Sequence, residues 1–314
     1  YVPSLEAEAE DFLKSWGDSG EKNLLECFAE LIIFTASRCL LGPAVRAKVG
    51  RDLARHFAAL DAGMQPLSVL WPYAPTPSHR IRDRGHVEIM KLFSAVVEER
   101  RASGEKGEDI LQVLMDAKYR DGSSPTNNEL GGMLISLLFA GQHTSTVTAT
   151  WTGMNLLRHP EALARVKAEM AEKLRPGEPL SFDNLGSLTF IQECIRESLR
   201  MYPPLIFVMR EVIRPIKHKN YTIPVGDIVV ASPQLGGRVE EVFENPDVWD
   251  PTRFEPPRQE DKKHPCAFAG FGYGRHHCLG EVFGLLQVKT IWSLLLRNFE
   301  MEPIGPMPTP DYAS

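Results

Sequence analysis

A long stretch with almost no charged side chains, residues 134–150, limits how this chain can fold. It lies within a predicted helix that begins at the capping box Thr126-Asn127-Asn128-Glu129 and continues to Arg158, where His159-Pro160 interrupts it. A helix with so little charge on any of its faces is predicted to be buried on nearly all sides. We therefore expect solvent to reach little of this helix.

Apolar residues at helical spacing predict further helices on both sides of the uncharged one. These helices are expected at residues 4–16, 23–41, 44–60, 79–104, 109–117, 160–174, 189–201 and 281–299, with a short turn-rich element at 181–188. Short apolar runs separated by Pro and Gly predict small strands at 207–209, 221–223 and 228–231. The sequence thus predicts a mainly α fold with a minor β-sheet, in a single domain over residues 1–314.

Composition excludes several classes of protein. The chain is 43% hydrophobic and 24% charged, which is typical of a globular fold with a large core. Its net charge of -6 argues against nucleic acid as a partner. Five cysteines show no disulfide-framework spacing, which favours a reducing compartment. No run of eighteen uncharged apolar residues is present, so we predict no membrane span within these 314 residues.

One cysteine near the C-terminal end has the surroundings of a reactive thiolate. Cys278 lies in the loop from Phe271 to Gly280, just before the predicted helix 281–299. The free amides and the positive dipole end at a helix N-terminus favour the thiolate form of a thiol. Gly272 lets the loop turn tightly, and Gly280 leaves no side chain beside the sulfur, so a flat ligand can approach. These features make Cys278 a candidate axial haem ligand.

Three other interpretations of this loop stay open from the residues alone. A lone cysteine is usually a small buried hydrophobe. Glycines before a helix can cradle a phosphate, although the Walker lysine and the dinucleotide spacing are missing here. A zinc ion is the third, although the spacing of the crowded ligand types fits no common zinc finger: His264, Cys266, His276, His277 and Cys278.

A second set of candidate residues lies halfway along the uncharged helix. Ala140 and Gly141 are small enough to let a flat cofactor approach, and Gly141 costs about 1 kcal/mol of helix stability relative to alanine. His143 and Thr144 follow with an imidazole and a hydroxyl group, which can deliver the protons that oxygen activation requires. Equally, the threonine can bond back to its own helix, and the histidine can be a satisfied core residue.

A third set is charged. Glu197 and Arg200 share one face of the helix that ends before Pro203-Pro204, and Arg253 follows in a Pro-x-Arg-Phe segment. A lone pair of this kind is usually a surface ion pair of little energetic value. If the three groups are buried together, each charge must be paired, and arginine suits this role because its donors form a fixed fork.

Taken in order, these motifs resemble those of the cytochrome P450 family. The carrying residues are Phe-x-x-Gly-x-His-x-Cys-x-Gly at 271–280, Ala-Gly-Gln-His-Thr-Ser at 140–145, Glu-x-x-Arg at 197–200 and Pro-x-Arg-Phe at 251–254. The family usually has an acid where this chain has His143, and that substitution resembles the sterol 14α-demethylases. The segments 35–42, 139–153 and 274–292 look closest to the plant and green-algal type.

The resemblance implies a role for each candidate residue. Cys278 would bind the iron of haem b, and Thr144 and His143 would handle oxygen activation and protons. Glu197, Arg200 and Arg253 would lock the cysteine loop. Other residues that would contact the haem are His276 and Arg210 at the propionates, and Phe271, Gly272, Gly280, Ala140 and Gly141. The residues that would line the substrate cavity are Leu60, Met64, Phe139, Leu205, Ile206, Phe207 and Met209.

The resemblance also implies an activity and partners. It predicts removal of the 14α-methyl group of a sterol by three successive oxygenations, with release of formate and formation of a C14–C15 double bond. O2 would be the oxidant, and NADPH–cytochrome P450 reductase would supply electrons. The enzyme would lie at the endoplasmic reticulum membrane, facing the cytosol. We expect its membrane anchor, its early helices and its final strand pair to lie outside these 314 residues.

Alternatives from three classes remain at this point. A monooxygenase of the same fold could act on another lipophilic substrate, such as a fatty acid or a xenobiotic, although His143 argues against it. A relative could rearrange peroxides without oxygen or a reductase, and Thr144 argues against that. The third alternative is a zinc-binding or structural helical protein without enzymatic activity.

Overall fold

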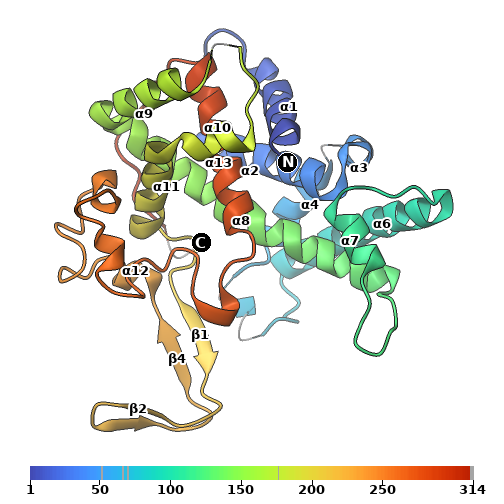
Figure 1. Ribbon diagram of the computed structural model, residues 1–314. Helices are drawn as coiled ribbons and strands as arrows, with labels where there is room; N and C mark the ends of the chain where they lie inside the picture. Colours follow the sequence, from blue (N-terminus) through green and yellow to red (C-terminus); the bar gives the residue numbers. More distant parts are fainter. Residues whose placement is uncertain (51, 66, 69–70, 176, 312–314) are drawn as a thin grey trace.

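The computed structural model describes residues 1–311 except 51, 66, 69, 70 and 176. These residues are mostly helical, with two small sheets (Figure 1). The helices are α1 Val2–Leu13, α2 Leu24–Leu41, α3 Pro43–Val49, α4 Asp52–Asp61, α6 Pro77–Ser103, α7 Ile110–Asp116, α8 Asn127–Arg158, α9 Pro160–Lys173, α10 Phe182–Ser187, α11 Thr189–Met201, α12 Pro233–Gly236 and α13 Glu281–Asn298. Single 3-10 turns are η1 Lys14–Trp16, η2 Pro251–Phe254, η3 Glu260–Lys262 and η4 Gly274–His276.

Helix α8 is the long helix that the capping box predicts. The Thr126 hydroxyl accepts a hydrogen bond from the Glu129 amide, and the Glu129 carboxylate accepts one from the Thr126 amide. Both otherwise unpaired amides at the start of the helix are therefore satisfied. The helix ends at Arg158, because Pro160 cannot donate the next backbone hydrogen bond.

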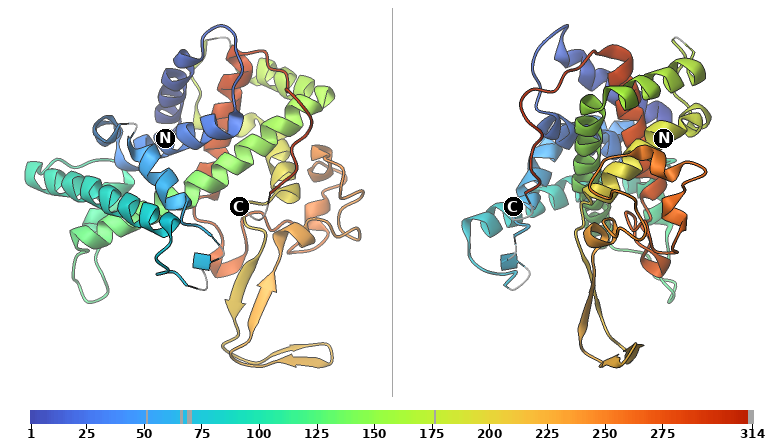
Figure 2. Two further views of the ribbon diagram at one scale, coloured as in Figure 1. Left: turned by 180° about the vertical axis from the view of Figure 1, so that it is seen from behind. Right: turned by 90° about the vertical axis from the view of Figure 1, so that its left-hand side faces the viewer.

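Two apolar clusters form the core, and α8 contributes to both. Its N-terminal half packs against α2, α6 and α7 through residues such as Leu134 and Leu138, in a cluster that also includes residues of α3 and α4. Its C-terminal half packs with α1, α9, α11 and α13 through Ala149 and Leu156. In Figures 1 and 2, α8 crosses the body of the molecule between these two groups of helices. Helix α8 therefore links the two clusters.

The contact between α8 and α13 is close. Gly153 has no side chain, and a Cβ atom there would lie 1.8 Å from the ring of Trp292. The Trp292 indole N–H donates to the Ala149 carbonyl oxygen at 2.9 Å. Nearer the start of α13, Gly284 faces Ser145, whose hydroxyl would be 3.7 Å from an added Cβ. The first turns of α13 therefore lie beside the middle of α8.

One prediction about α8 is wrong. The helix is not buried on nearly all sides, because Ser136, Leu137, Ala140 and His143 are exposed, with Leu137 at 40%. The lack of charged residues at these positions is therefore not explained by packing against another helix. This is the face that carries two of the candidate site residues, Ala140 and His143.

The helix predicted over residues 44–60 is also wrong in part. The structure divides it into α3 and α4, and α3 ends at Gly50, whose φ angle is +55°. A helix commonly ends where a glycine leaves the right-handed region. The apolar spacing continues across the break, which is why the sequence predicts a single helix.

The strands form two antiparallel pairs. Strand β1 (Val208–Glu211) pairs with β4 (Ile228–Ala231), and β2 (Ile216–His218) pairs with β3 (Tyr221–Ile223). Together they project from the helices as a long double hairpin (Figures 1 and 2). The apolar runs predict β1, β3 and β4, whereas β2 is too polar to be recognised. Among the helices that the structure describes, none combines the length and hydrophobicity needed to cross a lipid bilayer.

Candidate functional site

The cysteine loop is a tight turn stabilised by its own backbone. The Cys278 amide donates to the Phe271 carbonyl oxygen at 2.9 Å, and this bond closes the turn that contains η4. Gly272 and Gly274 have φ angles of +71° and +66°, which only glycine adopts readily. Gly280 then caps α13, and a Cβ there would lie 3.8 Å from the Cys278 sulfur. The thiol is free and exposed at the start of α13.

His277 closes the same loop from the other side. Its Nδ1 atom is 3.1 Å from the Gly272 carbonyl oxygen, and its Nε2 atom is 2.5 Å from a carboxylate oxygen of Glu281 in the first turn of α13. These two contacts raise the pKa of His277, the bond to the Gly272 carbonyl first. The sequence interpretation considered His277 only as a zinc ligand and missed this bridging role.

Thr144 and His143 lie on α8 as predicted, but their side chains have different partners. The Thr144 hydroxyl donates to the Ala140 carbonyl oxygen at 2.7 Å, which is the back-bonded state that the sequence left open. Ala140 is exposed, and a Cβ added at Gly141 would meet no atom within 4 Å. This stretch of α8 therefore offers a cleared surface to a ligand.

His143 has a partner that sequence reasoning missed. Its Nδ1 atom lies 3.8 Å from the Asp61 carboxylate, at the end of α4. Asp61 raises the pKa of the imidazole, and partial burial opposes this shift. The side chains are 53% and 40% exposed, so solvent reaches both groups. The imidazole is therefore a titratable group and not a satisfied core residue.

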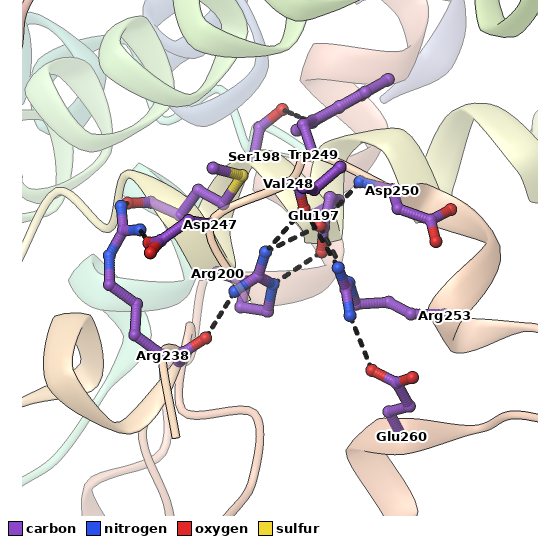
Figure 3. A network of polar contacts seen from close by, with 12 residues as sticks. Glu197, Ser198, Arg200, Arg238, Asp247, Val248, Trp249, Asp250, Arg253 and Glu260 are labelled. Atoms are coloured by element: carbon purple, nitrogen blue, oxygen red, sulfur yellow. Dashed lines mark hydrogen bonds and ion pairs between the residues drawn. The ribbon is translucent and has the colours of Figure 1, made fainter. Parts of the chain in front are cut away.

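Glu197, Arg200 and Arg253 come together in a fully buried network (Figure 3). The Glu197 carboxylate accepts from Arg200 at 2.8 Å and from Arg253 at 2.9 Å, and it also accepts from the Asp250 amide. These three charged residues are between 0% and 2% exposed. The arginines also donate to backbone carbonyl oxygens of Gly237, Val248 and Glu244. The Glu-x-x-Arg pair is therefore not a surface ion pair.

The network contains a fourth charged residue that the motifs do not include. Glu260, in η3, lies 2.6 Å from Arg253 and 2.9 Å from Arg258, and it is 2% exposed. Burial alone would raise its pKa, but hydrogen bonds from Arg258 and Arg253 lower it instead. The predicted trio has two positive charges, Arg200 and Arg253, and one negative charge, Glu197. Adding Glu260 makes the numbers of positive and negative charges equal. No sequence signal marks this residue, because it follows Arg253 through an irregular segment.

The remaining predicted residues are more scattered. Arg210 and His276 are exposed, and Phe271 packs partly against the core. Leu60 is buried, and Phe139 stacks on Phe57. Met64, Leu205, Phe207 and Met209 are between 48% and 64% exposed. Within the described residues, these side chains do not converge on one cavity.

A groove of about 1030 Å³ lies along the C-terminal half of α8. It is lined by the segments 16–25, 299–304 and 308–311 and by Tyr202, Pro203, Pro204 and Ile206, and Trp151 stacks on Tyr202 at its wall. His143 and Ile206 border this groove, whereas Leu60, Met64, Phe139, Leu205, Phe207 and Met209 do not. The groove is thus only partly the predicted substrate cavity.

The donor chemistry fits a thiolate-bound haem. A single exposed sulfur stands at a helix start, with glycine beside it and small residues on the neighbouring helix. In the part of the chain that the structure describes, no three His, Cys, Asp or Glu side chains are grouped so that they could hold a metal ion. The histidines and cysteines of the zinc alternative do not form such a group.

Comparison with known proteins gives one family. The family model "Cytochrome P450" matches residues 1–313. The chain is 43% identical to "Obtusifoliol 14-alpha demethylase" of Sorghum bicolor and to "Sterol 14-demethylase" of Arabidopsis thaliana, over 99% of this chain and 65% of each relative. It is 41% identical to "Lanosterol 14-alpha demethylase" of Bos taurus, over 100% of this chain and 63% of that relative. The chain therefore spans slightly less than two thirds of the length of these three proteins.

A solved structure supports the fold. The structure "Retinoic acid bound cyanobacterial CYP120A1" superposes with a TM-score of 0.86, over 94% of this chain and 67% of that one. The two sequences are 23% identical, so this likeness concerns the arrangement of helices and strands alone.

Proposed function

The chain belongs to the cytochrome P450 family, and from this premise we propose that it is part of a haem-thiolate monooxygenase that removes the 14α-methyl group of a sterol precursor. The observation that carries the substrate class is the identity of 41% to 43% with three relatives whose names share 14-demethylation and differ in the sterol. The Ala-Gly-Gln-His-Thr-Ser segment on α8 supports the same choice, because His143 stands there with an aspartate partner.

In this proposal haem b binds between the start of α13 and the exposed face of α8. Cys278 would hold the iron through its sulfur, and the small residues Ala140 and Gly141 would leave room for the group beside α8. His276 and Arg210 are exposed and can pair with propionate groups, while Phe271, Gly272 and Gly280 shape the loop. Bound haem would supply the oxygenation chemistry that no side chain can provide.

The protein's own residues then control protons and orientation. His143 exchanges protons with solvent, and Asp61 keeps its imidazole oriented by an ion pair. The Thr144 hydroxyl must leave the Ala140 carbonyl oxygen to donate elsewhere, and the open space at Gly141 permits that rotation. The apolar residues Leu60, Met64, Phe139, Leu205, Ile206, Phe207 and Met209 remain our proposed substrate contacts.

The partners follow from the same proposal. O2 is the oxidant, NADPH–cytochrome P450 reductase delivers the electrons, and the enzyme works at the endoplasmic reticulum membrane with its catalytic domain in the cytosol. Three successive oxygenations release the methyl carbon as formate and leave a C14–C15 double bond.

Spectral titration of the haem-loaded protein tests the substrate class. Addition of 14α-methyl sterols should give a saturable displacement of the Soret band, whereas fatty acids should not. A reversed preference would favour a monooxygenase for another lipophilic substrate. Product formation without NADPH would favour a peroxide-rearranging enzyme. Cys278→Ser should abolish the red-shifted Soret band of the reduced carbon monoxide complex, and an unchanged band would contradict the assigned ligand.

A further inference from the structure

Two adjacent carboxylates, Glu260 and Asp261, connect the buried ion network to the chain that enters the cysteine loop. Glu260 pairs with Arg253 at 2.6 Å, and Arg253 in turn pairs with Glu197 on α11. Asp261 pairs with Arg196, also on α11, at 2.8 Å. The short turn η3 is therefore held at two consecutive residues by different arginines, Glu260 by Arg253 and Arg258 and Asp261 by Arg196.

The second arginine reaches the loop itself. The Arg196 guanidinium lies over the ring of Phe254 at 4.2 Å and over the ring of Phe268 at 4.9 Å. Phe268 accepts a hydrogen bond from the Tyr273 hydroxyl at its carbonyl oxygen, inside the cysteine loop. Three residues after Phe268, the Phe271 carbonyl oxygen accepts the Cys278 amide. These contacts, together with the short chain segment 268–271, join Asp261 to the sulfur-bearing residue.

Burial makes this connection rigid. Glu260 is 2% exposed, and its remaining oxygen contacts are the Glu244 amide and the Arg258 guanidinium. Arg196 and Asp261 have side chains that are 19% and 13% exposed. A buried arginine that loses its carboxylate partner is strongly destabilised, because no water can replace that partner. Movement of η3 away from α11 would take Asp261 from Arg196, which keeps Glu193, and Glu260 from Arg253, which keeps Glu197. Each arginine would therefore lose one of its two carboxylate partners.

We propose that Glu260 and Asp261 are positioning residues, which anchor residues 260–271 to α11 and so fix the cysteine loop and the direction of the Cys278 sulfur. The motifs of the family account for Glu197, Arg200 and Arg253, and neither acidic residue belongs to them. The meaning of this inference for catalysis rests on the proposed function. The mechanical role of the two residues does not, because it concerns the loop with or without a bound cofactor.

Hydrogen exchange followed by mass spectrometry tests the anchor without haem. In Glu260→Gln, amides in peptides covering residues 264–280 should exchange faster by about tenfold or more, while peptides from α2 and α8 keep their rates. Asp261→Asn should give a smaller increase in the same peptides, because that pair is more exposed. Asp247→Asn is the matched control, since Asp247 is 82% exposed in its pair with Arg238 and should change nothing.

Two results would overturn the proposal. One is an unchanged exchange rate in peptides 264–280 for both Glu260→Gln and Asp261→Asn. The other is an increase spread evenly over the whole chain, which would make the carboxylates general stabilisers only. If Glu260→Gln does not fold, Glu260→Asp and Asp261→Asn carry the same test, and Glu260→Asp should retain most of the protection.

A second measurement separates this inference from the proposed function. In the haem-loaded protein, Glu260→Gln should lower the fraction of the reduced carbon monoxide complex that shows the red-shifted thiolate band. Glu260→Asp should restore part of it. If the parent protein shows no such band, the haem proposal fails while the exchange experiment still decides the anchor. If the parent shows the band and Glu260→Gln leaves it unchanged, the positioning role fails alone.

Discussion

The two sides of the candidate site are held in opposite ways. Around Arg253, the charges of Glu197, Arg200 and Glu260 are 0% to 2% exposed and make ion pairs of 2.6 to 2.9 Å. On α8, by contrast, His143 is half exposed and stands 3.8 Å from Asp61. The first region fixes geometry, and the second holds its imidazole by one longer ion pair that solvent can reach. The two regions therefore differ both in how closely their charges are paired and in how deeply they are buried.

The largest effect should come from breaking the buried side. Arg253→Met leaves Glu197 and Glu260 buried without their shared partner, so the free energy of unfolding should fall by about 3–5 kcal/mol. Urea unfolding followed by circular dichroism measures this loss. The control is Arg238→Met, which breaks the pair with the exposed Asp247 and should cost less than about 1 kcal/mol. Equal losses in the two variants would contradict the contrast between buried and exposed charges.

Lys289 shows what burial does to a charged group whose hydrogen-bond partner, Gln192, is neutral. It is 3% exposed, its Nζ atom donates to the Gln192 side chain at 3.2 Å, and burial lowers its pKa to about 8 although Glu169 and Glu193 oppose this shift. Because the unfolded value is about 10.4, the charged form is disfavoured in the folded state and stability should rise as the pH increases from about 8 to about 10.

Replacing this amine should therefore help the fold. Lys289→Met should raise the free energy of unfolding at pH 7 by about 1–3 kcal/mol and should remove the rise in stability above pH ~8. Thermal unfolding at a series of pH values measures both effects. The control is Lys91→Met, at an exposed lysine paired with Glu88, which should change neither. A loss of stability in Lys289→Met would mean that the buried amine is held by pairing after all.

Sequence reasoning succeeded where one local pattern determines one element. The capping box places the start of α8, and the apolar runs locate β1, β3 and β4. It failed where the outcome depends on distant residues. The exposed face of α8 depends on which elements cover it, and the partners of His143 and Arg253 lie 82 and 7 residues away in the chain. Asp61 and Glu260 carry no spacing rule, so only the folded geometry identifies them.

The Thr144 hydroxyl should affect turnover more than stability. Thr144→Ala removes one back-bond to Ala140, so unfolding should change by less than about 0.5 kcal/mol. On the proposed function, sterol turnover should fall by about tenfold or more, and Thr144→Ser should restore much of it. Thr150→Ala is the control, because Thr150 makes the same back-bond to Thr146. Equal turnover in Thr144→Ala and the parent would remove Thr144 from the proton path.

The smallest expected effect concerns the exposed pair of His143 and Asp61, and measuring it tests whether the pair forms in solution. Asp61 raises the pKa of His143, so Asp61→Asn should bring that pKa down towards the ordinary value of about 6.5. Nuclear magnetic resonance titration of the His143 ring protons measures it directly. A raised pKa in the folded state adds stability that is fully present below pH ~6.5 and is lost as the pH rises through the folded value. Parent and variant should therefore differ slightly in stability below that range and agree above it. If His143 titrates identically in parent and variant, the 3.8 Å contact with Asp61 does not orient the imidazole. The position of His143 is then set by its place on α8.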